Sequence, residues 1–329
     1  KYRSVLKNTL EFDPEVLKRY VNFMNNPDER TAVDQFGKGD KYFGIATLMA
    51  TLPGLPMFGH GQVEGLAEKY GMEYRRAYRD EHPDGHLVWR HEQELAPLLH
   101  RRHLFAGVDH FRLYDFVTPD GSVNDDVFAY SNRAGDERAL VIYHNRWAET
   151  RGFVHASAAW AVKRGEAREL RRTALHDGLG LEPGERWYSV FRDQVSGLEY
   201  LRANAEIAAH GLWVELGAYR RHVFVAFRHV EDGEGSYAHL AASLGARGVP
   251  SIEEALRRTF LPPRPAAFRD LAGPEMLRRR AAAAASEPGP DELAALLAEV
   301  EQQAIRLLAE VRQFAGGGDG DERRAAAEV

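Results

Sequence analysis

The chain has 329 residues, a net charge of −6 and no cysteine. The lack of cysteine excludes disulfides, thiolate metal ligands and a cysteine nucleophile. The acidic balance argues against nucleic-acid binding, and no stretch approaches the roughly 20 apolar residues of a membrane span. We therefore expect neither a nucleic-acid nor a membrane partner. A chain of this length can hold about two or three domains.

Residues 1–106 carry a strand–helix–strand pattern. Short apolar runs at Tyr20–Met24 and Leu55–Phe58 predict strands, and Asp40–Leu52 between them predicts a helix with one apolar face. A crossover of this kind joins two parallel strands, as in α/β proteins. A further helix is predicted over Leu87–Ala106.

Polar residues follow both predicted strands. Asn26 and Asp28 follow the first strand, and His60 and Gln62 follow the second. In parallel sheets and α/β barrels, functional side chains lie at the carboxyl ends of the strands. Asp28 is therefore the candidate catalytic carboxylate, and Asn26, His60 and Gln62 are candidate substrate contacts. Alternatively, Asn26 and Asp28 cap their own loop, and the glycines beside His60 and Gln62 simply let the backbone turn.

Two segments resemble the α-amylase superfamily, glycoside hydrolase family 13. Phe23-Met24-Asn25-Asn26-Pro27-Asp28 is similar to the Phe-x-x-Asn-His-Asp motif that ends the family's seventh barrel strand. Residues 53–62, P-G-L-P-M-F-G-H-G-Q, are similar to its eighth-strand motif, and residues 76–80 resemble a degraded form of the segment that follows. Pro27 stands where the family usually has a sugar-binding His. The resemblance therefore implies the role of the family's Asp for Asp28, whereas the family's His contact has no counterpart in this sequence.

The resemblance implies the last two βα units of a (β/α)8 barrel, with the nucleophilic Asp and the acid/base Glu upstream of residue 1. It implies the carboxyl-terminal portion of a retaining α-glycosidase or α-glucanotransferase that acts on an α-glucan or oligosaccharide. In such an enzyme Asp28 would stabilise the oxocarbenium-like transition state. We expect this chain alone to be inactive and to need no cofactor, with any Ca²⁺ in the missing part of the parent protein. The alternative is a non-catalytic carbohydrate-binding or interaction module, which Pro27 favours.

A cluster of His and Asp residues lies at His82, Asp84, His86 and His91. Its H-x-D-x-H spacing fits no helix face, and no second cluster completes four ligands. The sequence therefore predicts no metal site.

Residues 107–231 change to a period of two. Alternating runs separated by Gly, Asn and Asp turns predict an all-β antiparallel sandwich, with hairpin turns at residues 120–124 and 133–137. The predicted strands are Phe111–Phe116, Val127–Asn132, Ala139–His144, Gly152–Ala156, Tyr188–Arg192, Leu198–Arg202 and a long run at Leu212–Arg228.

Residues 232–315 predict a helical region, and the Gly/Asp-rich tail at 316–329 predicts disorder. The longest helix is expected over Asp291–Phe314. Its apolar positions alternate steps of four and three residues, which is a heptad pattern and requires a partner helix. That partner is the Met276–Ala285 segment, a missing domain or a second copy of the chain. The seam residues are Leu293, Leu297, Val300, Ala304, Leu307, Val311 and Phe314.

Overall fold

The computed structural model describes the chain except for residues 72–74, 165–166, 261–263, 287–288 and 316–329. It divides into two compact units, Lys1–Ile252 and Glu253–Val329, and each is described by itself. The domain boundaries predicted near residues 107 and 232 stay predictions. The predicted disordered tail lies outside the described residues.

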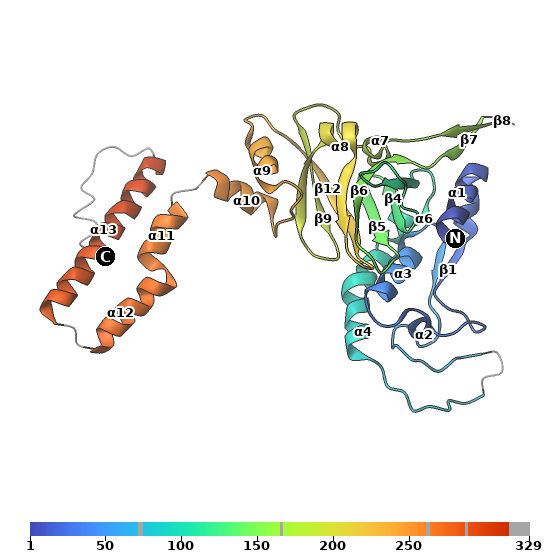
Figure 1. Cartoon of the computed structure of the whole chain (residues 1–329), viewed down its shortest axis with the longest axis horizontal. Coiled ribbons are helices and arrows are strands. Elements are labelled where there is room, and N and C mark those ends of the chain that lie inside the picture. Colours follow the sequence, from blue (N-terminus) through green and yellow to red (C-terminus); the bar gives the residue numbers. More distant parts are fainter. Residues whose placement is uncertain (72–74, 165–166, 261–263, 287–288, 316–329) are drawn as a thin grey trace. The chain divides into compact units, whose positions relative to one another are not determined.

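The predicted strand–helix–strand unit is confirmed (Figure 1). Strands β1 (Val21–Phe23) and β2 (Leu55–Met57) are parallel, and α3 (Asp40–Thr51) connects them. They form a two-stranded sheet of their own, in which Val21 pairs with Leu55 and Phe23 with Met57. All four of these apolar side chains are exposed. One face of the small sheet is therefore uncovered in the part of the chain that the structure describes.

Helix α3 is buried on nearly every side, and not along one face only as its sequence predicts. Leu48 and Leu52 pack into the core shared with the large sheet, whereas Tyr42 packs into a second core with the helices that follow β2. Gly44 permits this close packing, because a Cβ atom there would overlap the ring of Tyr143. The helix is thus fixed between two layers, and it fixes β1 and β2 in turn.

The helix predicted over Leu87–Ala106 is interrupted. The chain forms α4 (Gly85–Arg90), a π-helical segment η2 (His91–Leu95), α5 (Ala96–Leu99) and α6 (Arg102–Ala106). Pro97 has no N–H to donate to the carbonyl four residues earlier, and the backbone widens just before it. The other helical elements of this part are α1 (Tyr2–Phe12), η1 (Pro14–Arg19) and α2 (Ala32–Phe36).

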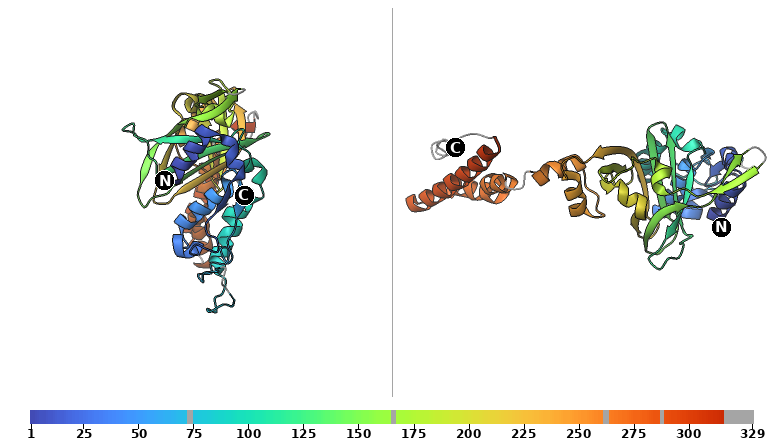
Figure 2. Two further views of the ribbon diagram at one scale, coloured as in Figure 1. Left: turned by 90° about the vertical axis from the view of Figure 1, so that its right-hand side faces the viewer. Right: turned by 90° about the horizontal axis from the view of Figure 1, so that it is seen from above.

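The β-rich region forms one curled, eight-stranded antiparallel sheet in the order β10-β9-β12-β5-β4-β3-β6-β11 (Figures 1 and 2). Gly135, with a φ of 58°, forms the predicted tight turn between the paired strands β4 and β5. The strands are β3 (Arg112–Val117), β4 (Val127–Ala134), β5 (Glu137–His144), β6 (Thr150–Ser157), β9 (Trp187–Asp193), β10 (Glu199–Ala203), β11 (Leu212–Leu216) and β12 (Arg221–Glu231).

This continuous sheet differs from the predicted sandwich of two sheets. Residues Arg221–Phe224 of β12 pair with β5, and residues from Phe224 to Glu231 pair with β9. A β-bulge between Val225 and Arg228 interrupts the pairing with β9, and Ala226 within it has a φ of 53°. Bulges bend a strand and increase its twist, and this long strand lies between β9 and β5 in one continuous sheet. Period-two sequence patterns identify strands but not their pairing partners, which is why the sandwich prediction failed.

Along the first part of β12, both faces of the curled sheet are buried. Along β12, Val223 and Val225 face the helices of the first part, and Phe224 faces the inner core. The sequence did not indicate the separate hairpin β7 (Trp160–Arg164) and β8 (Ala167–Arg171), nor the short helices α7 (Leu175–Leu179) and α8 (Asn204–His210).

The predicted helical region is confirmed in outline. Its helices are α9 (Ser236–Leu244), α10 (Ile252–Phe260), α11 (Arg264–Ala272), α12 (Pro274–Ser286) and α13 (Pro290–Ala315).

The heptad seam of α13 is partly covered among the described residues, and its cover by a missing domain or a second copy stays a prediction. Ala304 is 2% exposed where α13 packs against α11, but Leu293, Leu297 and Val311 are exposed. The side chain of Phe314 lies outside the described residues. The short α11 covers the middle of α13, which is much longer, and this leaves apolar positions of the same stripe open at both ends.

Candidate functional site

The loop after β1 carries the candidate carboxylate. Asp28 lies at the carboxyl end of the parallel strand pair, and its side chain is exposed. Its backbone N–H and carbonyl are hydrogen-bonded, but no bond or ion pair engages its carboxylate in the described part of the chain. A loop-capping Asp would use these oxygens on backbone N–H groups. The carboxylate of Asp28 is therefore available to a ligand.

Asn26 caps this loop. Its Oδ1 accepts hydrogen bonds from the backbone N–H of Asp28 at 2.9 Å and of Glu29 at 3.0 Å. This Asx turn sets the position from which Asp28 projects. The Oδ1 of Asn26 therefore caps the loop, as one of the two alternatives expects. A sugar contact through its Nδ2 group stays a prediction.

The loop after β2 places its two candidate residues differently. His60 is exposed, and its ring centroid lies 4.7 Å from that of Tyr70. Gln62 is 2% exposed. Its Oε1 accepts the Gly59 N–H at 3.0 Å, and its Nε2 lies 3.3 Å from the sulfur of Met24. Direct substrate contact by Gln62 stays a prediction that this buried geometry does not favour, because the side chain holds the turn below His60.

The two loops are brought together at two points. Lys69 Nζ donates to the Asp28 carbonyl at 2.9 Å. A Cβ atom at Gly59 would overlap the side-chain amide of Asn25, so only glycine fits there.

Asn25 is buried, and its Oδ1 has no hydrogen-bond partner among the described residues. A buried unpaired oxygen costs about 1–3 kcal/mol. Asn25 is not among the site residues expected from the sequence, although its place directly after the predicted strand is a signal for it.

A buried hydrogen-bonded column supports the β2 loop. Tyr42 donates its hydroxyl proton to the Gln62 carbonyl at 2.7 Å, and His91 Nε2 lies 2.9 Å from the same hydroxyl oxygen. Since the Tyr42 proton is already committed, His91 Nε2–H must be the donor. Burial lowers the pKa of His91 to about 4 and raises that of Tyr42. Both groups are therefore neutral near pH 7. His91, considered above as a metal ligand, is a structural residue.

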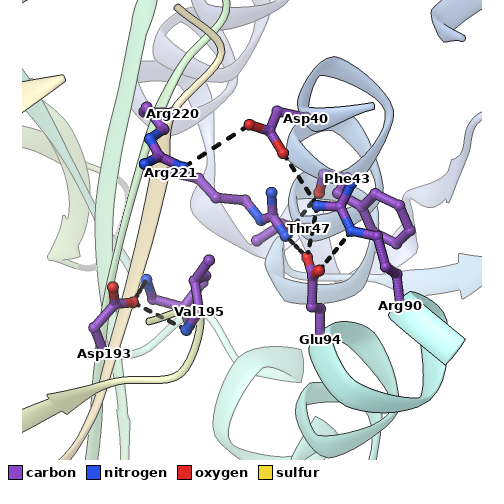
Figure 3. A network of polar contacts seen from close by, with 10 residues as sticks. Asp40, Phe43, Thr47, Arg90, Glu94, Asp193, Val195, Arg220 and Arg221 are labelled. Atoms are coloured by element: carbon purple, nitrogen blue, oxygen red, sulfur yellow. Dashed lines mark hydrogen bonds and ion pairs between the residues drawn. The ribbon is translucent and has the colours of Figure 1, made fainter. Parts of the chain in front are cut away.

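A cluster of ion pairs joins this column to the large sheet (Figure 3). Glu94 of η2 accepts from Arg90 at 2.6 Å and is also paired with Arg221 of β12. Arg90 reaches Asp40 at 3.1 Å and lies over the ring of Phe43, with its guanidinium carbon 3.9 Å from the ring centroid. Burial lowers the pKa of Arg221 to about 10, so it remains charged at neutral pH. The sheet and the loop-bearing helices are thereby locked together.

Arg102 fixes the start of β2. Its guanidinium donates to the carbonyls of Ala50 and Leu52 at 2.8 Å and to that of Gly54. These carbonyls belong to the end of α3 and the turn that follows, where the last helical carbonyls have no partner within the helix. This arginine therefore holds β2 in register with β1.

Within the described residues, no group of three or more His, Asp or Glu side chains is placed to hold a metal ion. Asp84 of the His/Asp cluster instead accepts the backbone N–H groups of His86 and Leu87 and caps α4. Among the described helices, none is both long enough and apolar enough to cross a bilayer.

No family model matches the chain, and no curated protein matches it. Solved structures match the chain over part of its length. An α-amylase from Geobacillus thermoleovorans, complexed with acarbose, has a TM-score of 0.43 at 12% identity over 69% of this chain and 46% of that chain. The debranching enzyme from Nostoc punctiforme has a TM-score of 0.40 at 13% identity over 65% and 36%.

A pullulanase from Anoxybacillus sp. LM18-11, complexed with maltotetraose, has a TM-score of 0.37 at 14% identity over 63% of this chain and 28% of that chain. The chain thus spans less than half the length of each of these proteins. The chain is similar in structure to parts of these three proteins.

Proposed function

We propose that this chain contributes Asp28 and part of the cleft floor to a retaining α-glycosidase or α-glucanotransferase that acts on α-linked glucans. The observation that supports this most is the free carboxylate of Asp28 at the carboxyl end of two parallel strands. An oxocarbenium-like transition state carries positive charge that the ground state lacks. A fixed carboxylate beside it therefore favours the transition state selectively.

The exposed apolar face of β1 and β2 supports the same proposal. In a (β/α)8 barrel the inward side chains of the strands pack in layers and form a core. Val21, Phe23, Leu55 and Met57 form two cross-strand pairs on one face of the small sheet, opposite to buried Asn22. These pairs suit the interior of a partial barrel that further strands complete. On this proposal residues 1–106 are the last βα units of that barrel, and the curled sheet is the domain that follows it.

The test is Asp28→Asn in the longer protein that contains this chain, with Glu29→Gln as the matched control on the same loop. Turnover of an α-glucan should fall by about 10²–10³-fold in Asp28→Asn, mainly in kcat, because the charge being stabilised exists only in the transition state. The control should retain its turnover. Unchanged kcat in Asp28→Asn would leave Asp28 a solvated loop residue and would refute the proposal.

A matching expectation concerns the 329-residue chain alone. It should not hydrolyse a chromogenic α-glucoside, because the proposed nucleophile and acid/base lie outside it. Activity that is lost in Asp28→Ala and absent from a mock preparation would show that the chemistry is complete within this chain.

A non-catalytic carbohydrate-binding or interaction module is the second candidate function. Pro27, in place of the family's sugar-binding His, favours it. The two candidates differ in one result: the module binds glucan with or without the Asp28 carboxylate, whereas the enzyme needs that carboxylate for turnover.

A further inference from the structure

A strip of exposed and half-buried side chains runs along the outer face of β6 and β11. Trp213 lies opposite Phe153, and Glu215 lies opposite Arg151. Because alternate residues of a strand face opposite sides, these four share one face, while their neighbours Leu212, Val214 and Leu216 face the inner core. The rings of Trp213 and Phe153 meet edge to face, with centroids 4.8 Å apart.

A second aromatic pair lies at the other end of the strip. Trp147, in the connection between β5 and β6, is 79% exposed. Its ring centroid lies 5.9 Å from that of Tyr219, in the turn between β11 and β12. The backbone of Tyr219 has a φ of 53°, a conformation that side chains other than Gly, Asn and Asp rarely adopt. Its N–H donates to the Arg146 carbonyl at 3.0 Å and joins the two connections.

Strained backbone of this kind persists where the surroundings enforce it, and it occurs preferentially at functional sites. Here the strain keeps one aromatic ring beside another that is almost fully in solvent. Tyr219 also packs against the core, but the exposed Trp147 contributes little to the folded state, so stability does not account for the place of Trp147.

A polar groove lies between the two aromatic pairs. Its cavity has a volume of about 460 Å³. It presents the carboxylates of Glu149 and Glu215 and the guanidinium of Arg151, and the other lining residues are Thr150, Leu216 and Gly217. Along the strands the order is therefore aromatic pair, charged groups, aromatic pair. Residues 213 to 217 of an extended strand span roughly 13 Å, enough for several sugar units.

We propose that this strip is a binding site for a neutral oligosaccharide, separate from the loops after β1 and β2. Aromatic rings accept the C–H faces of pyranoses, and carboxylate and guanidinium groups bind their hydroxyls. Two carboxylates against one guanidinium disfavour an anionic ligand such as a nucleic acid or a sugar phosphate. That the oligosaccharide is an α-glucan rests on the proposed function. A proline-rich peptide, which also docks in aromatic-lined grooves, is the rival ligand.

The test measures binding of maltoheptaose to the 329-residue chain by titration calorimetry, and its retardation in native gels that contain soluble starch. Trp147→Ala should weaken binding at least about tenfold, since tryptophans that a ligand covers carry much of the energy of a binding surface. Trp147→Phe should restore part of it, and Glu215→Gln should weaken it. The matched control is Phe268→Ala, which removes an exposed aromatic side chain from the other unit. Unfolding midpoints should be unchanged in Trp147→Ala, because its ring is in solvent.

Two results would overturn the inference. These are equal binding by Trp147→Ala and wild type, and binding of a proline-rich peptide that maltoheptaose does not displace. Binding of cellohexaose in preference to maltoheptaose would overturn the assignment of the ligand as an α-glucan. Asp28→Asn separates this site from the proposed catalytic one. It should leave binding at the strip unchanged whether or not it abolishes turnover in the longer protein, so either proposal can fail alone.

Discussion

Arg221 of β12 is ion-paired with Glu94 of the π-helical segment η2, and this pair is a buried link between the curled sheet and the helices that support the β2 loop (Figure 3). Arg221 is 4% exposed. The same carboxylate also accepts from Arg90, so one acidic group is paired with two guanidiniums that come from different layers.

Removing Glu94 should therefore destabilise the first unit strongly. Glu94→Ala leaves two cationic groups without their shared partner, one of them buried, and should lower the free energy of unfolding by about 3–5 kcal/mol. Glu92→Ala, at an exposed position of the same segment, should change it by less than about 0.5 kcal/mol. Urea unfolding followed by circular dichroism measures both. Equal midpoints for the two variants would mean that solvent, and not Glu94, neutralises the arginines.

Stability should fall in mildly acidic solution because of His91. Its pKa is lowered by burial to about 4, whereas an unfolded chain protonates His near pH 6.5. The neutral imidazole therefore stabilises the fold fully above about pH 6.5, and that contribution is lost as the pH falls towards 4. It amounts to about 3 kcal/mol.

The measurement compares unfolding free energies between pH 7 and pH 4 for wild type and His91→Gln, with exposed His60→Gln as the control. Glutamine can still donate to Tyr42 but does not titrate, so His91→Gln should lose less stability on acidification than wild type. Parallel curves for wild type and His91→Gln would show that other groups cause the acid sensitivity.

The apolar face of β1 and β2 should make the isolated chain associate. Both strands of a two-stranded sheet have an unpaired edge, and exposed apolar patches promote association. Val21→Thr combined with Leu55→Thr removes one cross-strand apolar pair and keeps or raises β-propensity, so it should increase the monomer fraction in sedimentation velocity. Val123→Thr, at an exposed position elsewhere, should not. A chain that is already monomeric at high concentration would contradict this prediction.

Substitution by Asp should affect helicity differently at two positions on α13. Ala304 is 2% exposed and Leu297 is 59% exposed. Ala304→Asp buries a charge and should unfold the helices of the second unit, with loss of helical circular dichroism. Leu297→Asp should leave helicity unchanged and should dissociate any oligomer that forms through the seam. Loss of helicity in Leu297→Asp would mean that α13 is covered there by a partner helix in solution.

The local elements of this protein could be predicted from its sequence. The parallel pair β1–β2, the crossover α3 and the hairpin turn at Gly135 follow from apolar spacing and turn residues, which act over a few neighbouring positions. The strand-end rule likewise selected Asp28, whose free carboxylate is consistent with that choice. These features depend on residues that are close together in the chain.

What only the tertiary structure decided depends on residues that are far apart. Strand β12 pairs with both β5 and β9 and so makes one sheet where two were expected, because register and pairing are set by partners that a period-two pattern does not name. Gln62 reads as a rim residue in the sequence, yet contacts with Gly59 and Met24 turn it inward. The pairing of Arg221 with Glu94 joins positions on different layers. Burial and long-range pairing arise only when the layers pack, so the sequence named the candidate residues and the packing decided which of them face solvent.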